Sequence, residues 1–247
     1  VLKRNTFLSS PVESLTLPSS VELEDGCFGD SNLSCLKIIQ NGVENIKYYQ
    51  NKYILSKTNT KSDNFDIIHW ANHDLEEAII PSNIKIISAF AFDNVKRVIF
   101  EENSELQLIK KFAFYNCCIE SITIPQNVKM IHREVFSSCK KLKTIKFSEN
   151  SELTTIGPCF CRDTPIEKVC IPDYLTEIKT KTFCNCNKLK IVECSKNSQL
   201  KAIEKSAFQN VSLESLVIPS SIELKNKWCQ GLVKLDSIQI IKQEEEN

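Results

Sequence analysis

Two closely spaced cysteine pairs are the residues with the clearest capacity for chemistry. Cys159 and Cys161 are separated by one residue, and so are Cys184 and Cys186. Four thiolates at such spacings could hold a zinc ion, because tetrahedral zinc sites are commonly built from cysteine. A disulfide between Cys161 and Cys184 is a second interpretation, and free thiols are a third. The choice depends on whether the fold brings the two pairs together.

The three histidines form no recognisable catalytic grouping in the sequence. His69 and His73 are four residues apart, a spacing that places both on one side only in a helix, whereas the surrounding segment favours strand and loop. His132 has no neighbouring serine or cysteine in a nucleophile motif. We therefore predict no catalytic residues, no metal site and no enzymatic activity.

Composition argues against several further classes of function. The 247 residues include 31 Lys and Arg against 31 Asp and Glu, so no basic excess is available to neutralise nucleic-acid phosphates. Only five Gly are present, with no GxGxxG or Walker pattern, so no nucleotide cofactor is expected. No apolar run approaches the roughly 20 residues that a membrane helix needs. We predict no nucleic-acid partner, no cofactor and no membrane span in this chain.

The elements that must position these residues belong to a repeat, seen most completely in residues 166–188. Ile166, Val169 and Ile171 have the L-x-x-L-x-L spacing of a leucine-rich repeat strand. Alternate residues of a strand share a face, so Val169 and Ile171 point inward together. Pro172 ends the strand because it cannot donate a ladder hydrogen bond. The back half of the unit continues with three apolar residues that cover the other side of a thin core: Leu175, Ile178 and Phe183.

The same frame recurs along the chain, and from Val95 onward its openings are 22 to 24 residues apart. Strand openings fall at Val12, Leu33, Leu75, Val95, Ile119, Leu142, Ile166, Leu189, Leu213 and Leu235. The back half recurs as Ile84/Ile87/Phe92, Leu106/Ile109/Phe114, Val128/Ile131/Phe136 and Leu200/Ile203/Phe208, and with one residue deleted as Leu153/Ile156/Phe160. Turns with an Ile-Pro step after the strand alternate with turns that carry ENSEL or a close variant.

The frame also bears on the cysteines. Cys139 and Cys186 each come three residues after the frame phenylalanine, in a slot that Val95 fills elsewhere. A slot shared by Cys and Val is small and apolar, which favours buried free thiols. Cys161 and Cys184 occupy equivalent positions in adjacent turns, so the four sulfurs of the two pairs need not converge.

This pattern resembles the BspA-like, or Treponema pallidum-type, leucine-rich repeat family. The residues that carry the resemblance are Ile124-Pro125, Val128, Ile131, Phe136 and Cys139, together with the Ala-Phe pairs at 91–92, 113–114 and 207–208. We predict an α/β-type, β-rich leucine-rich repeat solenoid. It would form a right-handed superhelix with one parallel β-sheet and with short strands, turns or 3₁₀ segments on the opposite side. Residues 1–247 would form this single solenoid, and because Val1 is not an initiator residue we expect the chain to be cut from a longer one.

The largest departure from the frame lies at about residues 47–74. Tyr48, Tyr49 and Tyr53 favour one strand, a polar turn cluster follows, and Trp70 belongs to a second apolar run. We predict a β-hairpin that stands off the stack or replaces one turn, and the resemblance implies the same. Because aromatic residues are enriched at binding hot spots, these four residues are one candidate partner-binding surface.

The outward strand positions are the other candidate binding surface, because solenoids use their broad sheet for macromolecular partners. They form a mixed polar row with three apolar members. The row consists of Arg97, Ile99, Ser121, Thr123, Thr144, Lys146, Lys168, Ile191, Glu193, Ser215 and Val217.

The resemblance, rather than these residues, implies the biological role. It implies a cell-surface or secreted antigen that adheres to host or matrix proteins. An intracellular, cytoplasmic scaffold for protein–protein interaction is the alternative, consistent with abundant unpaired cysteines. The oligomeric state is not predicted.

Overall fold

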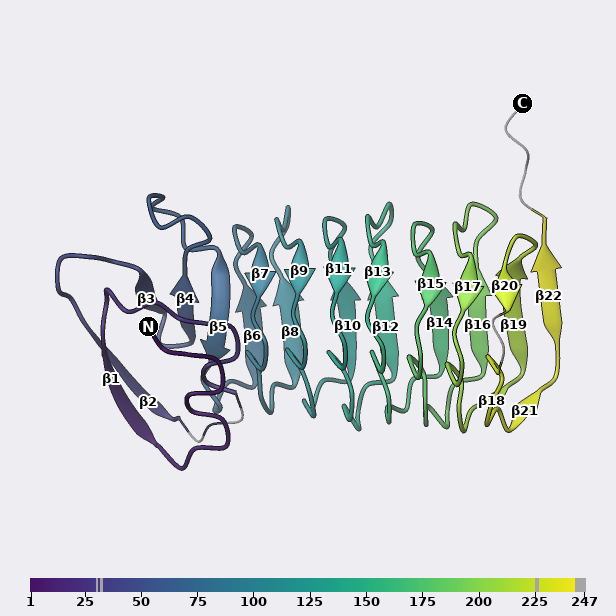
Figure 1. Ribbon diagram of the computed structural model, residues 1–247, viewed down its shortest axis with the longest axis horizontal. Helices are drawn as coiled ribbons and strands as arrows, with labels where there is room; N and C mark the ends of the chain where they lie inside the picture. Colours follow the sequence, from purple (N-terminus) through teal and green to yellow (C-terminus); the bar gives the residue numbers. More distant parts are fainter. Residues whose placement is uncertain (30, 32, 225–226, 243–247) are drawn as a thin grey trace.

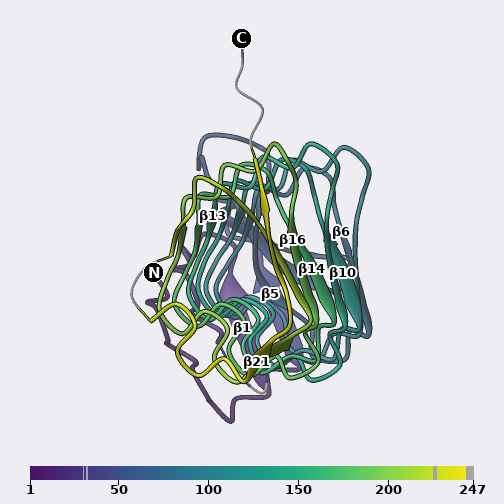
Figure 2. The same cartoon turned by 90° about the vertical axis from the view of Figure 1, so that its right-hand side faces the viewer.

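The computed structural model describes residues 1–247 with the exception of residues 30, 32, 225–226 and 243–247. The chain winds into an elongated β-solenoid whose coils lie side by side along the long axis (Figure 1). Viewed along that axis, successive coils of the array surround a common interior (Figure 2). Each coil contributes one strand to a long side that we call the front wall, and ten such strands are present among the described residues.

The front wall is built entirely of parallel strands. The first nine begin two residues after the predicted strand openings. They belong to three sheets: β1 (Ser14–Pro18) with β2 (Cys35–Ile39); β6 (Glu77–Ile80) with β8 (Arg97–Phe100); and β10 (Ser121–Ile124), β12 (Thr144–Phe147), β14 (Lys168–Ile171), β16 (Ile191–Cys194), β19 (Ser215–Pro219) and β22 (Ile238–Ile241).

The opposite side, the back wall, is made of very short strands that also pair with one another. The prediction of one parallel sheet is therefore too simple, because the inward isoleucine of each coil lies in register with that of the next, as Ile109 does with Ile131. One sheet contains β7 (Ile86–Ile87), β9 (Leu108–Ile109), β11 (Met130–Ile131) and β13 (Thr155–Ile156), and another contains β15 (Glu177–Ile178), β17 (Ala202–Ile203) and β20 (Glu223–Leu224). β18 (Ser212–Leu213) pairs with β21 (Lys234–Leu235) at a corner.

The described residues contain no α-helix and no 3₁₀-helix. The predicted α/β class is therefore wrong. The back half of each coil consists of short strands and turns. The reason lies around the frame phenylalanine of each coil. Two residues that flank it adopt the left-handed conformation, as Glu134 (φ 57°) and Ser138 (φ 63°) do around Phe136. Left-handed residues interrupt a right-handed helix, so each corner turns sharply instead of continuing as a helix.

The segment at 47–74 holds three strands rather than a two-stranded hairpin. β3 (Ile46–Tyr49) pairs antiparallel with β4 (Tyr53–Ser56), and β4 pairs antiparallel with β5 (Ile67–Ala71). The first turn is tight because Gln50 and Asn51 are both left-handed, with φ of 52° and 55°. β5 then pairs parallel with β7, so these three strands extend the back wall instead of standing off it.

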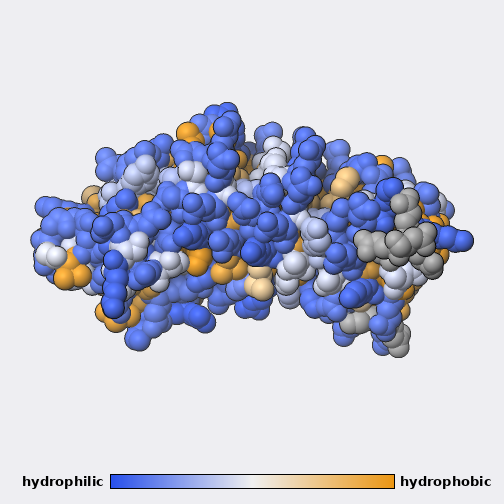
Figure 3. Space-filling view, turned by 90° about the horizontal axis from the view of Figure 1, so that it is seen from above, coloured by the Kyte–Doolittle hydropathy of each residue, from blue (hydrophilic) through white to orange (hydrophobic). Residues whose placement is uncertain are grey.

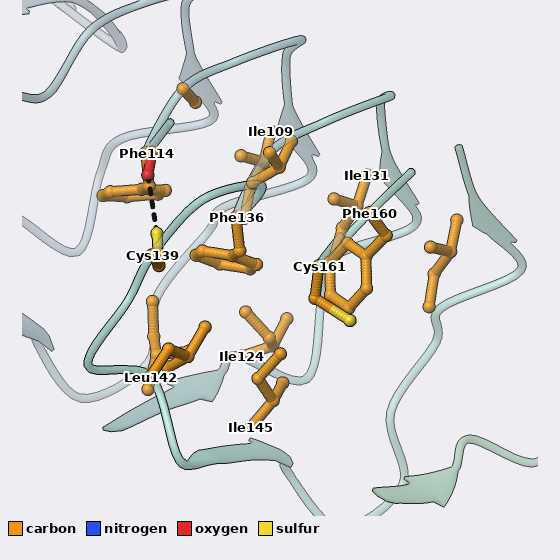
Figure 4. Close-up of a cluster of buried hydrophobic side chains, with 14 of the residues drawn as sticks. Ile109, Phe114, Ile124, Ile131, Phe136, Cys139, Leu142, Ile145, Phe160 and Cys161 are labelled. Carbon is orange, nitrogen blue, oxygen red and sulfur yellow. Dashed lines mark hydrogen bonds between the residues drawn. The ribbon is translucent and has the colours of Figure 1, made fainter. Parts of the chain in front are cut away.

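Stacked aromatic and aliphatic side chains form the interior of the array (Figure 4). Phe114, Phe136 and Phe160 are buried, with ring centroids 5.5 Å and 5.3 Å apart along the stack. Val169, Ile171 and Ile178 are likewise buried, as the repeat frame predicts. Because burial of apolar area drives folding and each coil covers the next, the stack itself is the core of the molecule.

Asparagine marks the corner after the frame phenylalanine for two reasons. Asn185 and Asn210 are left-handed, with φ of 60° and 58°, a conformation that Asn tolerates better than most residues. Their side chains also form a ladder from coil to coil: Asn210 Nδ2 donates to Asn185 Oδ1 at 2.7 Å, and Asn185 Nδ2 donates to Asp163 Oδ1 at 2.7 Å. The fold thus supplies each exposed corner with a polar connection to its neighbour.

The coil with one residue deleted is accommodated by a glycine. A Cβ atom at Gly157 would lie 2.4 Å from the backbone nitrogen of Arg133 and 2.6 Å from the carbonyl carbon of His132. No side chain fits at that distance. Only glycine at position 157 therefore allows the shortened coil to approach its neighbour this closely.

A second core lies at the N-terminal end. Leu17, Phe28, Leu36, Ile54 and Trp70 belong to a buried cluster that is separate from the core of the array. In Figure 1 β1 and β2 lie at an angle to the strands of the array, with β3–β5 next to them. The molecule therefore consists of a regular array and an N-terminal region joined through the three inserted strands.

Candidate functional site

The outer surface of the front wall collects the predicted row of outward residues. None of them is buried: Arg97, Ile99, Ser121, Thr123, Lys146 and Lys168 are exposed, and Thr144, Ile191, Glu193, Ser215 and Val217 are half-buried. Cross-strand register aligns them, since Thr144 lies between Ser121 and Lys168, and Ile191 lies between Lys168 and Ser215. The alternation along each strand places these side chains on one surface.

The front wall is not uniformly paired, and the interruptions follow the two kinds of turn. An Ile-Pro strand and the strand after it pair over four residues, as β10 does with β12 and β14 with β16. The reverse step is weaker to different degrees: β8 and β10 belong to separate sheets, β12 pairs with β14 only at Thr144 and Lys168, and β16 pairs with β19 over three residues. An ENSEL turn places two more residues than an Ile-Pro turn between the end of its strand and the next inward apolar residue.

A groove lies on the front wall where β12 and β14 separate. It has a volume of about 1490 Å³ and extends over β12, β14, β16 and the loops that follow them. Four of the predicted residues line it, namely Thr144, Lys146, Lys168 and Glu193. Of the other predicted residues, Ser121 and Thr123 lie on β10, and Arg97 and Ile99 lie beyond the break between β8 and β10. The structure therefore assembles part of the predicted row into a concave site.

Sequence reasoning missed three further residues of this groove. Phe147, Asp173 and Tyr174 line it, and Tyr174 is 48% exposed. Sequence reasoning considered only the outward strand positions of the front wall, whereas Phe147 ends β12 and Asp173 and Tyr174 belong to the Ile-Pro turn after β14. Ile79 was missed as well: it lies beside Ile99 on neighbouring strands, and both side chains are exposed.

Charges on the front wall are partly neutralised by one another. Lys168 Nζ lies 2.7 Å from Glu193 Oε2, and Arg97 Nε lies 2.7 Å from Glu77 Oε2. The hydrogen bond to Glu193 raises the pKa of the Lys168 ammonium above its ordinary value. Lys146 has no carboxylate within 4 Å among the described residues, which leaves its charge available in the groove.

Elsewhere the surface is largely hydrophilic, and apolar residues appear in small separate patches in the view from above (Figure 3). Within the described part of the chain, no helix has the length and apolar composition of a membrane span. The groove on the front wall is larger than the hollow lined by Lys140, Asp163 and Asn185, which has a volume of about 480 Å³.

The structure corrects half of the aromatic surface expected on the insertion. Tyr53 and Trp70 are 0% and 2% exposed, so they lie in the two cores and cannot contact a partner. Because β3–β5 join the back wall, their inward side chains face the interior, and the Tyr53 hydroxyl donates to the Ile79 carbonyl at 3.0 Å. Tyr48 and Tyr49 remain half-buried at the surface.

The cysteine pairs do not form the arrangement considered from the sequence. All twelve cysteines are free, and Cys161 is adjacent to Cys186 rather than bonded to Cys184: Cys186 Sγ donates to the Cys161 carbonyl at 3.1 Å. Burial raises the pKa of the Cys161 thiol. Cys139 Sγ similarly donates to the Phe114 carbonyl of the preceding coil at 3.0 Å (Figure 4). The described residues contain no group of three or more His, Cys, Asp or Glu able to hold a metal ion.

His69 and His73 have different surroundings. His69 is buried, with Nε2 at 2.8 Å from Ser56 Oγ and Nδ1 at 3.4 Å from Ser88 Oγ. Burial lowers the pKa of His69 to about 4, so its imidazole is neutral at physiological pH. His73 Nδ1 lies 3.1 Å from Asp93, and the hydrogen bond to Asp93 raises the pKa of His73. The two histidines therefore serve separate contacts.

Comparison with known proteins places this architecture among leucine-rich repeat proteins. The family model described as BspA type leucine rich repeat region matches six copies, over residues 1–69, 67–190 and 154–246. A leucine-rich repeat protein from Eubacterium ventriosum is similar in structure with a TM-score of 0.69 and 22% identity; the alignment covers 91% of this chain, which spans only 59% of that protein.

Two further solved structures match more distantly. A T. pallidum leucine-rich repeat protein has 19% identity and a TM-score of 0.45, over 73% of this chain and 79% of that one. A leucine-rich cell-surface protein from Faecalibacterium prausnitzii has 15% identity and a TM-score of 0.30, over 82% and 94% of the two chains. No curated protein matches the sequence.

Proposed function

Because the chain belongs to the BspA-type leucine-rich repeat family, we propose that it is a non-enzymatic scaffold that binds partner proteins through its front wall. The partners would be host or matrix proteins met at the cell surface or after secretion, as the family resemblance implies. Solenoids of stacked repeats offer a broad, stiff surface suited to macromolecular rather than small-molecule partners.

The single observation that supports this proposal is the groove between β12 and β14. It combines an exposed aromatic ring at Tyr174, a charge without a carboxylate partner at Lys146 and an ion pair between Lys168 and Glu193. Protein interfaces concentrate binding energy in aromatic residues surrounded by polar groups that fix orientation. A protruding loop or side-chain cluster of a partner would enter this groove, while the rest of the wall provides the rim.

Charge reversal tests the proposal. The variant with Lys146→Glu and Lys168→Glu would be compared with a matched variant carrying Lys188→Glu and Lys205→Glu, two exposed lysines outside the groove. Binding to a panel of purified matrix proteins would be measured by biolayer interferometry. We expect the groove variant to lose about tenfold or more in affinity for any matrix protein that the native chain binds, because like charges would replace complementary ones.

Two outcomes would contradict the proposal. One is an equal affinity of both variants and the native chain for the same matrix protein. The other is the absence of any bound matrix protein across the panel at micromolar concentrations of the folded chain.

An intracellular scaffold for protein–protein interaction is the second candidate, and one observation favours it. None of the twelve cysteines is in a disulfide, and seven of them are buried. Cytosolic conditions keep thiols reduced, whereas exported proteins commonly carry disulfides. Thiol titration of the native and denatured protein, isolated under alkylating conditions from its own cell, separates the two: intact bridges favour export, and only free thiols favour the intracellular role.

A further inference from the structure

Two lysines of the inserted strands converge on one phenylalanine ring. Lys47 Nζ lies 4.4 Å from the centroid of the Phe65 ring, and Lys57 Nζ lies 4.7 Å from the same centroid. Lys47 Nζ also lies 5.1 Å from the centroid of the Tyr49 ring. Phe65 itself is 5% exposed, so the lysine side chains form part of the cover over its ring.

The strand pairing brings these residues together from separate parts of the insertion. Lys47 and Tyr49 are alternate residues of β3 and share one side of the strand, and Lys47 is paired with Leu55 of β4. Lys57 follows Leu55 by two residues and comes directly after the last residue of β4, Ser56. Phe65 returns to this point after the polar loop that connects β4 to β5. The cluster is thus fixed by the antiparallel pairing of β3 and β4.

The two ammonium groups have no counter-charge of their own. In the part of the chain that the structure describes, no carboxylate lies within 4 Å of either Lys47 or Lys57. Two acidic residues close to them in sequence have other partners: Asp66 accepts from the Thr58 backbone nitrogen at 2.7 Å and from Thr58 Oγ1 at 2.6 Å, and Glu44 accepts from Gln40 Nε2 at 3.2 Å. Two like charges held at one ring repel each other, and an anion between them would remove that repulsion.

We propose that Lys47, Lys57 and Tyr49 form a second binding site, which takes the carboxylate of an acidic segment of a partner protein. A carboxylate has two acceptor oxygens, so it can accept hydrogen bonds from two ammonium groups at once. The half-exposed Tyr49 offers apolar contact to the methylenes of a glutamate.

Polyanions fit this site less well than an acidic peptide. Nucleic acids and sulfated glycans require extended positive surfaces, whereas this chain has 31 basic and 31 acidic residues and no net charge. The cluster is a local site on the inserted strands, and its residues lie outside the front-wall groove. It therefore does not depend on the function proposed for that groove.

Titration with short peptides tests the site directly. Acetyl-tetraglutamate amide would be added to the isotope-labelled chain, with acetyl-tetraglutamine amide as the matched uncharged control. We expect saturable chemical-shift changes at Tyr49 and Phe65 with the glutamate peptide and none with the glutamine peptide. Lys47→Met and Lys57→Met keep the aliphatic stem over the ring, and each is expected to weaken binding about tenfold, whereas Lys61→Met, in the exposed loop, leaves it unchanged.

Each result decides the matter. Three outcomes would overturn the proposal. The chemical-shift changes could fail to saturate, or the Lys47/Lys57 double variant could keep native amide spectra and bind the glutamate peptide with unchanged affinity. The third outcome is tighter binding of inorganic sulfate than of the glutamate peptide. Chains reversed at Lys146 and Lys168 should keep the peptide response, so failure of the front-wall function and failure of this site are told apart.

Discussion

The regular array and the N-terminal region are held together in different ways. In the array, residues of the same type stack on one another, as Phe92, Phe114 and Phe136 do, and a single buried cluster extends through its coils. In the N-terminal region a separate cluster joins Phe28 to Ile54 and Trp70 of the inserted strands. Neighbouring coils of the array are therefore aligned by their matching side chains, whereas the N-terminal region needs additional contacts to be held against the array.

A polar network provides those contacts. Asp25 of the N-terminal region accepts hydrogen bonds from Ser88 Oγ at 2.5 Å and from the Ala89 backbone nitrogen at 2.9 Å, and lies 3.4 Å from Lys110 Nζ. Ser88 also contacts the buried His69. Although burial raises the pKa of the Asp25 carboxyl, the hydrogen bonds and the charge of Lys110 outweigh it, so the pKa lies below its ordinary value. Where the repeat is interrupted, these hydrogen bonds and this ion pair hold the two regions together in place of stacked side chains.

The largest effect is expected from removing a stacked ring of the array. Phe136→Ala leaves a cavity between two neighbouring rings, and we expect a loss of about 3–5 kcal/mol in the free energy of unfolding, measured in urea. Phe28→Ala is the matched change in the other region, since Phe28 is 1% exposed. For Phe28→Ala, hydrogen exchange should show lost protection in β1–β5, which contribute to the same cluster, and unchanged protection in β10–β14, because coils contact only their neighbours.

Global loss of protection in both variants would contradict the distinction between the two cores. A loss below about 1 kcal/mol for Phe136→Ala would instead contradict the claim that the stack is the core.

The next effect concerns pH and belongs to the joint between the regions. The pKa of His69 is about 4 in the folded chain and about 6.5 in an unfolded one. Above pH 6.5 the residue is neutral in both states. As pH falls from 6.5 to 4, the unfolded state binds the proton before the folded state does. The free energy of unfolding should therefore fall by up to about 3 kcal/mol, the energy that corresponds to the difference between the two pKa values of His69.

Urea unfolding of the native chain and of His69→Gln at several pH values checks this expectation. The variant should show a flatter dependence between pH 6.5 and 4, whatever its absolute stability. His132, whose pKa burial also lowers, and His73, whose pKa is raised, titrate in both proteins and cancel in the comparison. Identical slopes would show that His69 is not buried in its neutral form.

A smaller effect is expected from the bridging carboxylate. Asp25→Ala leaves the Ser88 hydroxyl, the Ala89 nitrogen and Lys110 without their acceptor, at a cost of about 1–3 kcal/mol. Asp25→Asn keeps an acceptor oxygen but loses the charge, so it should cost less. Hydrogen exchange in β1 and β2 should rise more than exchange in β10 and β12. A uniform change across both regions would argue against a clamp located at the joint.

The sequence was sufficient to predict the array because its information is repetitive. The strand openings, the inward aliphatics and the frame phenylalanine recur at a fixed interval, and the strands begin where that frame places them. The absence of helix was only partly predictable: the left-handed corner carries Asn in several coils, as at Asn185 and Asn210, but around Phe136 the left-handed residues are Glu134 and Ser138, types that do not signal that conformation.

The candidate sites were less predictable because they depend on departures from the repeat. Outward strand positions follow from alternation, so the front-wall row was found, but the opening between β12 and β14 arises from pairing that no single strand reveals. Tyr53 and Trp70 were misplaced because the inserted strands joined the back wall instead of standing off it. Lys47 and Lys57 were missed because their common contact, Phe65, is close to neither of them in sequence.

The smallest effect expected here tests whether the corners of the array depend on amide ladders or only on backbone conformation. Asn185→Gly keeps the left-handed conformation, with φ of 60° in the native chain, but loses the bonds to Asp163 and Asn210. Asn185→Ala loses both the bonds and the conformational ease. We expect Asn185→Ala to lower the free energy of unfolding in urea by about 1–2 kcal/mol. Asn185→Gly should lower it less, because Gly adopts the left-handed conformation without the strain that Ala adds. Equal costs would assign the stabilisation to the ladder, and a negligible cost for Gly would assign it to the backbone.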